Sequence, residues 1–163
     1  MVEHDWRDSS PIATRRAAEE YENIARVGLE CFRNKLPENQ RHHSDVPFAI
    51  YANFGRAIEL GLKSFLMHQG IPAKQLRGRA VFGHDLKRCL GGAISHGLLS
   101  DVKLSSLHQS VIRGLSGPYY EKLFDYPHIG AVELMHVDQV AAATRELLAG
   151  LSNVPYKPVK SNR

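Results

Sequence analysis

The strongest constraint on the fold of this chain is the segment from Pro47 to His68, in which apolar residues recur at helical spacing around most of the helix. The apolar set comprises Phe48, Tyr51, Ala52, Phe54, Ala57, Ile58, Leu62, Phe65 and Leu66. Such a band is wider than the seam of a coiled coil and is typical of a helix that lies among several others. The segment therefore predicts the central helix of a bundle, with Gly70 as its C-terminal cap.

Four further helices are expected from the same periodicity, and no segment alternates as a half-buried strand would. Ser10 and Pro11 suit the cap and the first position of one of them, and Ser100 is expected to cap another. The aromatic stretch 116–130 contains two prolines, so we expect it to be largely irregular. The predicted helices cover approximately residues 11–35, 84–96, 100–114 and 132–149.

These elements predict an all-α protein, an antiparallel up-and-down bundle of about five helices. The 163 residues suit one domain, over 1–152, followed by a flexible basic tail at 153–163. No apolar run approaches the ~20 residues that span a bilayer, and the polar N-terminus does not resemble a signal peptide. Cys31 and Cys89 form no disulfide framework. We therefore expect a cytoplasmic protein with no membrane partner.

Basic side chains outnumber acidic ones, and the net charge of +4 mildly favours anionic partners. The densest basic cluster surrounds one predicted loop and comprises Lys74, Arg77, Arg79, Lys87 and Arg88. Two interpretations stay open for this cluster. It is either a solvated loop or a patch that contacts phosphate groups.

Motifs for several enzyme chemistries are missing. There is no glycine-rich phosphate loop, no Gly-x-Ser-x-Gly elbow and no His-Glu-x-x-His zinc motif. None of the nine histidines is followed by another four residues later, the spacing that places two imidazoles on one helical face. We therefore expect no metal and no cofactor.

A row of polar residues nevertheless follows one side of the predicted central helix. Asn53, Arg56, Glu59 and Lys63 are three or four residues apart. One interpretation is a solvated stripe with a Glu59–Lys63 pair, worth ~0.3–0.5 kcal/mol. The other is a set of partly buried, paired charges, because a central helix has little free surface.

Several short segments resemble the HEPN family (higher eukaryotes and prokaryotes nucleotide-binding domain). They are A-I-E-L-G-L-K-S-F-L at 57–66, Gly70, G-H-D-L at 83–86 and H-G-L at 96–98. D-Y-P at 125–127 resembles a later tyrosine-proline element, although Asp125 stands where the family usually has a basic residue. The resemblance covers roughly residues 45–130.

This resemblance implies a helical bundle that dimerises side by side and, in many members, binds RNA in the dimer cleft. Active members are metal-independent endoribonucleases of toxin–antitoxin and other defence systems. Their signature is an Arg followed by four to six residues and a His, in the later part of the domain. Arg79 and His84 have this spacing but come too early, so the catalytic motif is missing from its usual place.

The candidate site is therefore a polar centre formed by Arg56, Glu59, Lys63, His84 and Asp85, with Arg77 and Arg79 beside it. We expect the Glu59–Lys63 row to meet the His84–Asp85 helix start across the bundle. His84 itself is either a helix-capping or packing residue, or a catalytic one.

The preferred function is a non-catalytic, HEPN-like binding domain. It acts as a homodimer that binds RNA, a nucleotide or a partner protein such as a nucleotidyltransferase. One alternative is a metal-independent endoribonuclease that uses Arg79 and His84. A third interpretation is a structural subunit that acts only through protein interaction.

Overall fold

The computed structural model describes residues 10–40, 46–78, 80–125 and 134–156. Within these ranges the chain forms seven α-helices, one short 3-10 helix and no strand, which confirms the predicted all-α class. None of the described helices is both long and apolar enough to cross a membrane. The elements are α1 (Pro11–Asn34), η1 (Glu38–Gln40), α2 (Phe48–His68), α3 (Ala73–Arg77), α4 (Leu86–Ser95), α5 (Leu98–Asp101), α6 (Ser106–Tyr120) and α7 (Val137–Ser152).

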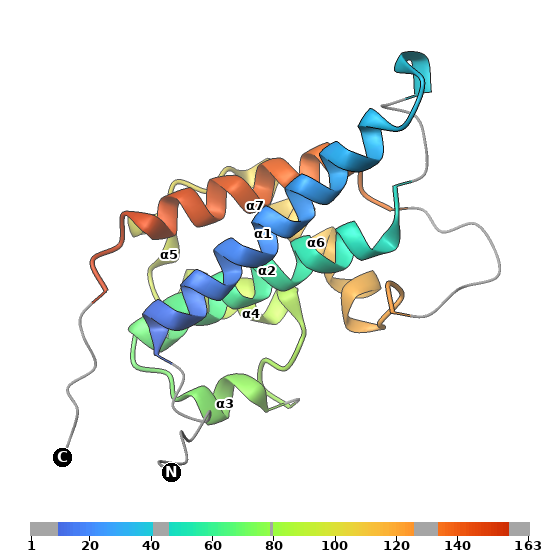
Figure 1. Cartoon of the computed structure of the whole chain (residues 1–163). Helices are drawn as coiled ribbons and strands as arrows, with labels where there is room; N and C mark the ends of the chain where they lie inside the picture. The colour runs from blue at the N-terminus through green and yellow to red at the C-terminus, as the bar shows by residue number, and fades with distance from the viewer. Residues whose placement is uncertain (1–9, 41–45, 79, 126–133, 157–163) are drawn as a thin grey trace, which may run out of the picture.

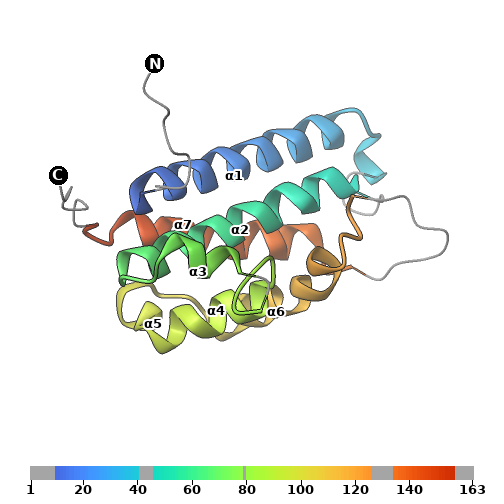
Figure 2. The same cartoon turned by 90° about the horizontal axis from the view of Figure 1, so that it is seen from below.

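Helix α2 lies at the centre of the fold, as its wide apolar band predicts. It contacts α1, α4, α6 and α7, which surround it (Figures 1 and 2). Its large apolar side chains form the middle of the core, and Phe54, Ile58, Leu62, Phe65 and Leu66 are fully buried. Because neighbours cover α2 on most sides, three of its polar side chains, Glu59, Lys63 and Ser64, are buried as well.

The helix directions differ in one respect from an up-and-down bundle. Helices α1 and α2 are antiparallel, and so are α6 and α7 (Figure 1). Helix α4, however, runs in the same direction as α2 (Figure 2), because α3 and the turns around it carry the chain back along α2 first. This return brings Gly83 beside Lys63 in the middle of α2.

Helix α6 corrects two predictions. Its cap is Ser105, whose hydroxyl accepts from the His108 N–H at 3.2 Å, and Ser100 lies in the single turn of α5 instead. Between these two helices, Val102 and Leu104 are buried, which holds the chain away from a continuous helix. The helix also continues to Tyr120 through Pro118, within the stretch predicted to be irregular.

Two other helices differ from the prediction. Helix α3 forms where a loop was expected, and α7 begins at Val137 and runs through Gly150 to Ser152. The first residues of the predicted tail are packed: Val154 is 5% exposed, and the Tyr156 hydroxyl lies 3.1 Å from Ser64 Oγ. Residues 157–163 lie outside the described ranges.

Candidate functional site

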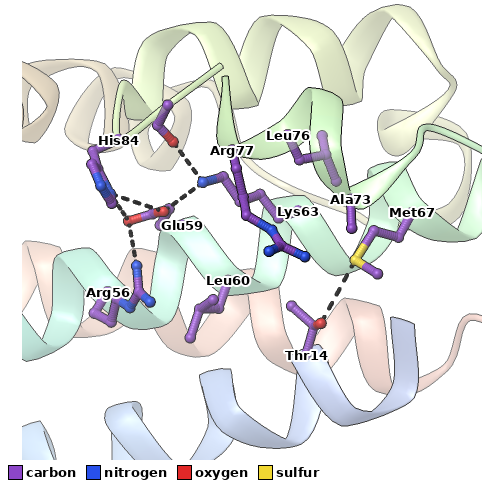
Figure 3. Close-up of a pocket in the computed structure, with 11 residues that line it drawn as sticks. Thr14, Arg56, Glu59, Leu60, Lys63, Met67, Ala73, Leu76, Arg77 and His84 are labelled. Carbon is purple, nitrogen blue, oxygen red and sulfur yellow. Dashed lines mark hydrogen bonds and ion pairs between the residues drawn. The ribbon is translucent and has the colours of Figure 1, made fainter. Parts of the chain in front are cut away.

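The candidate site is built around a buried carboxylate, Glu59, in the middle of α2. Its side chain is 1% exposed and accepts hydrogen bonds from three donors on α2 and α6. Lys63 Nζ lies 2.6 Å from Oε1, the Tyr119 hydroxyl donates to Oε2 at 2.6 Å, and Arg56 Nη1 donates to Oε2 at 3.1 Å. Figure 3 shows Arg56, Lys63 and His84 converging on this carboxylate. Glu59 thus connects two residues of its own helix to α6.

These partners keep Glu59 ionised. Burial raises the pKa of its carboxyl. Lys63, Tyr119 and Arg56 together lower that pKa by more than burial raises it, so the net shift is downward. The pKa of Tyr119 is raised by burial and then by the Glu59 charge, so its hydroxyl keeps its proton and donates. A negative charge is therefore held in the protein interior by one ammonium, one guanidinium and one phenol.

His84, directly before α4, completes the cluster. Its Nδ1 lies 3.1 Å from Glu59 Oε2 and 3.2 Å from Oε1. Because an ionised carboxylate only accepts, this nitrogen must carry the hydrogen. The side chain is 56% exposed, so the opposite nitrogen, Nε2, is accessible from outside. Lys63 also donates to the Gly83 carbonyl at 2.5 Å, which fixes the backbone next to His84.

The structure thus brings together four of the five residues predicted for the polar centre, and the predicted meeting of Glu59 with Lys63 and His84 is present. Asp85 has a different role. As the cap of α4, it accepts from the Arg88 N–H and from the Ser116 hydroxyl, each at 3.0 Å. Ser116 Oγ accepts in turn from the Lys87 N–H at 3.0 Å. Asp85 therefore joins α4 to α6.

A cavity of about 380 Å³ opens beside this cluster, between α2, α3 and the residues before α4 (Figure 3). Arg56, Lys63, Arg77 and His84 line it together with Glu59. Its remaining wall is partly apolar and includes Leu60 and Leu76 of α2 and α3. Three cationic side chains and a single carboxylate thus stand among the described residues of the lining.

The described residues of the predicted basic cluster have different surroundings. Arg77 lines the cavity, whereas Lys74, on the same short helix, is exposed and is not part of the lining. Arg88 pairs with Asp85 at 3.2 Å and donates to the Ala80 carbonyl, also at 3.2 Å. Lys87 is exposed, and Arg79 lies outside the described residues.

Tyr119 is the member of the cluster that the sequence analysis missed. It lies 60 residues from Glu59 in the chain, at the end of a helix expected to stop earlier. A glycine at position 55 allows the approach, because a Cβ there would overlap the Tyr119 ring. The aromatic stretch near Tyr119 was visible in the sequence, but helical spacing alone does not connect it to α2.

Comparison with known proteins adds nothing to this geometry, since no family model, curated protein or solved structure matches the chain. Over the described parts of the chain, no group of three or more histidine, cysteine, aspartate or glutamate side chains could hold a metal ion. The arrangement of these side chains is therefore the basis for assigning a function.

Proposed function

We propose that this chain is a non-catalytic, HEPN-like helical binding domain that holds a phosphate group of RNA or of a nucleotide in the cationic cavity. The observation that carries the proposal is the cavity lining, in which Arg56, Lys63 and Arg77 face a single carboxylate among the described residues. A volume of about 380 Å³ falls within the roughly 300–1,000 Å³ of small-ligand sites.

The charges of the cavity divide into an inner and an outer group. Lys63 is 8% exposed and is engaged by Glu59 and Gly83, so it neutralises the buried carboxylate. Arg56 is 37% exposed and Arg77 is exposed, and both have guanidinium groups suited to phosphate oxygens. The outer group therefore presents the two guanidinium groups that a phosphate would contact.

The HEPN resemblance supports the same site, because both of its main segments contribute to the cavity. Residues 57–66 supply Glu59 and Lys63, and residues 83–86 supply Gly83 and His84. The proposal accordingly includes action as a homodimer, in a defence or toxin–antitoxin setting, with a partner protein such as a nucleotidyltransferase.

The test compares two charge deletions on the same short helix. Arg77→Ala removes a cation that lines the cavity, and Lys74→Ala removes an exposed cation that does not. Fluorescence anisotropy with a short single-stranded RNA, measured at several salt concentrations, should show about five- to tenfold weaker binding for Arg77→Ala. The slope of log affinity against log salt should also fall by about 0.7.

Lys74→Ala should have a clearly smaller effect in the same assay. Equal losses of RNA affinity in the two variants would show that binding depends on the general positive charge of the surface. Binding that does not respond to salt would favour the apolar protein interface of the third interpretation, because burial of apolar surface depends little on ionic strength. Either outcome would contradict the proposed cavity.

A metal-independent ribonuclease is the second candidate, and the contact between His84 and Glu59 favours it. A carboxylate that holds Nδ1–H leaves Nε2 as a base that could take the proton of a 2′-hydroxyl, with Arg56 close enough to the cluster to stabilise a charged phosphorane. Purified protein should be incubated with mixed-sequence RNA in excess chelator, beside His84→Ala and Arg79→Ala. Cleavage that is lost in His84→Ala would make the chain an enzyme, and uncleaved RNA supports the binding domain.

A further inference from the structure

A second pocket, of about 310 Å³, adjoins the cationic cavity, and its lining is aromatic. Arg56 and His84 line both pockets and form the boundary between them. The second pocket adds Tyr21 from α1, Tyr119 and Tyr120 from the end of α6, and Phe124 from the turn that follows. Segments far apart in the sequence thus present aromatic rings beside a cationic site.

Several of these rings are held in place by other contacts. Phe124 stacks on Tyr51, with ring centroids 5.7 Å apart and planes 15° apart. The Tyr119 hydroxyl is anchored on Glu59, and the Arg56 guanidinium lies 6.0 Å from the centroid of the Tyr21 ring. Rings that are ordered before binding lose little conformational freedom when a ligand arrives. Tyr120, in contrast, is 53% exposed and lies at the surface.

Lys122, another lining residue, has an unusual backbone conformation. Its φ is +56°, in the left-handed region that favours glycine at this place after a helix. The Lys122 N–H bonds to the Tyr119 carbonyl, and the Leu123 N–H bonds to the Pro118 carbonyl, as in a Schellman motif. A glycine would form the same turn without strain, so a lysine here points to a use for its side chain.

The polar groups of the second pocket differ from those of the cavity. Arg56 and Lys122 provide positive charge, but Asp125 and Asn53 are also present. A carboxylate repels a phosphate, yet carboxylates and amides bind the ring-edge donors and acceptors of nucleobases. The second pocket therefore suits a flat, polar-edged ring better than a second phosphate.

We infer that the two pockets form one bipartite site for a nucleoside phosphate, with the phosphate in the cationic cavity and the base among the rings of Tyr21, Tyr120 and Phe124. This inference rests on the proposed function, since it needs the cavity to hold phosphate. Aromatic side chains beside cationic ones are a general solution for unpaired nucleotides. The same chemistry is offered by a free mononucleotide and by one nucleotide of single-stranded RNA.

The first test compares AMP with ribose 5-phosphate by isothermal titration calorimetry on the full chain. If the base is bound, AMP should bind about five- to a hundredfold tighter than the sugar phosphate. Tyr120→Leu should bring the two affinities closer together, and Tyr120→Phe, which keeps the ring, should preserve the difference. Arg77→Ala should weaken both ligands by the same factor, because it acts on the phosphate.

Lys122 provides a variant that separates binding from folding. Lys122→Gly relieves the backbone strain, so its thermal midpoint should equal or exceed that of the wild type, while AMP binding should weaken by about fivefold. Lys122→Asn tolerates the same left-handed conformation and should weaken binding in the same way. Full AMP affinity in both variants would remove Lys122 from the site.

The outcomes distinguish this inference from the proposed function. Equal affinities for AMP and ribose 5-phosphate would overturn the base pocket and leave the phosphate cavity in place. Binding of neither ligand, nor of a single-stranded oligoadenylate, would overturn both. If AMP binds more tightly than ribose 5-phosphate, the comparison of AMP with oligoadenylate identifies the ligand. Tighter binding of oligoadenylate identifies RNA, and tighter binding of AMP identifies a mononucleotide.

Discussion

Lys63 Nζ lies 2.6 Å from Glu59 Oε1 on the central helix, and both side chains are buried. They are four residues apart, a spacing that on a helix surface contributes only a few tenths of a kcal/mol. In the interior the situation differs, because each charge has lost its hydration and depends on the other. The pair therefore makes the site rigid and also makes the fold sensitive to the loss of one partner.

Replacing Lys63 with methionine should lower the free energy of unfolding by about 3–5 kcal/mol, because Glu59 would be buried without its ammonium partner. The measurement is equilibrium unfolding in urea. Arg56→Met is the matched control. Its guanidinium pairs with the same carboxylate but is 37% exposed, so its loss should have a smaller effect.

The double variant Lys63→Met/Glu59→Gln should recover part of that stability, since it buries no unpaired charge. This recovery would appear as a favourable coupling energy in a double-mutant cycle. If Lys63→Met were no more destabilising than Arg56→Met, the buried pair would not have the structural role assigned to it here.

Acid should weaken the cluster through Glu59. The pKa of this carboxyl lies below its usual 4.5 because Lys63, Tyr119 and Arg56 outweigh the opposing effect of burial. A group with a lowered folded pKa contributes its full stabilisation above the unfolded pKa and loses it as the pH falls through the folded value. The stability of the wild type relative to Glu59→Gln should therefore be greatest near neutral pH and diminish below about pH 4.5.

Urea unfolding of both proteins across this pH range, at constant ionic strength, measures the difference directly. Comparison with Glu59→Gln cancels the other carboxyls, including Glu146, whose pKa is lowered mainly by His108 against a desolvation that raises it. A difference that stays constant down to acid pH would mean that Glu59 does not titrate in the folded protein as its contacts require.

Local sequence signals were sufficient for the parts of the fold that depend on neighbouring residues. Ser10 caps α1 with its hydroxyl, as expected, and the apolar band of α2 is buried where the periodicity predicts. The shared face of Arg56, Glu59 and Lys63 follows from helical geometry alone. For that reason, these three members of the cluster could be placed together from the sequence, and His84 was a candidate through its place in the G-H-D-L segment.

The remaining features depend on packing between distant segments. Whether the polar row was solvated or buried could not be decided from spacing, because α4 and α6 determine what covers α2. The hydrogen bond from Tyr119 to Glu59 joins residues that are 60 positions apart in the chain. Pro118 is a helix breaker by local rules, yet α6 continues through it and packs against α2, α4 and α7. The aromatic pocket was missed for the same reason.

Glycine at position 55 should be required for the Tyr119 contact. In Gly55→Ala the new Cβ would overlap the Tyr119 ring, so α6 or the ring must move, with a loss of about 1–3 kcal/mol in unfolding free energy. Gly91, in α4, is the matched control because nothing lies within 4 Å of an added Cβ there. Gly91→Ala should stabilise the protein by about 0.5–1 kcal/mol through helix propensity.

Urea unfolding of both alanine variants gives the comparison. The fluorescence of Tyr119 overlaps that of the other tyrosines, so it does not report on this residue alone. Tyr119→Phe therefore serves as a second reference variant, because it removes the hydroxyl and keeps the ring. A Gly55→Ala protein as stable as Gly91→Ala would show that the ring can withdraw freely and that its bond to Glu59 contributes little.

Asp85 provides a test of structure against function within the residues predicted for the site. Its carboxylate caps α4 and accepts from Ser116 of α6, so Asp85→Ala should lower the free energy of unfolding by about 1–2 kcal/mol. Asp85→Ser, which can still cap, should lower it less. Because Asp85 is not among the residues that line the cavity, RNA or AMP affinity measured well below the unfolding midpoint should be unchanged in both variants. Weaker binding by the well-folded Asp85→Ser protein would show that Asp85 does belong to the polar centre. It would also mean that a change in the cap of α4 alters the loop before that helix.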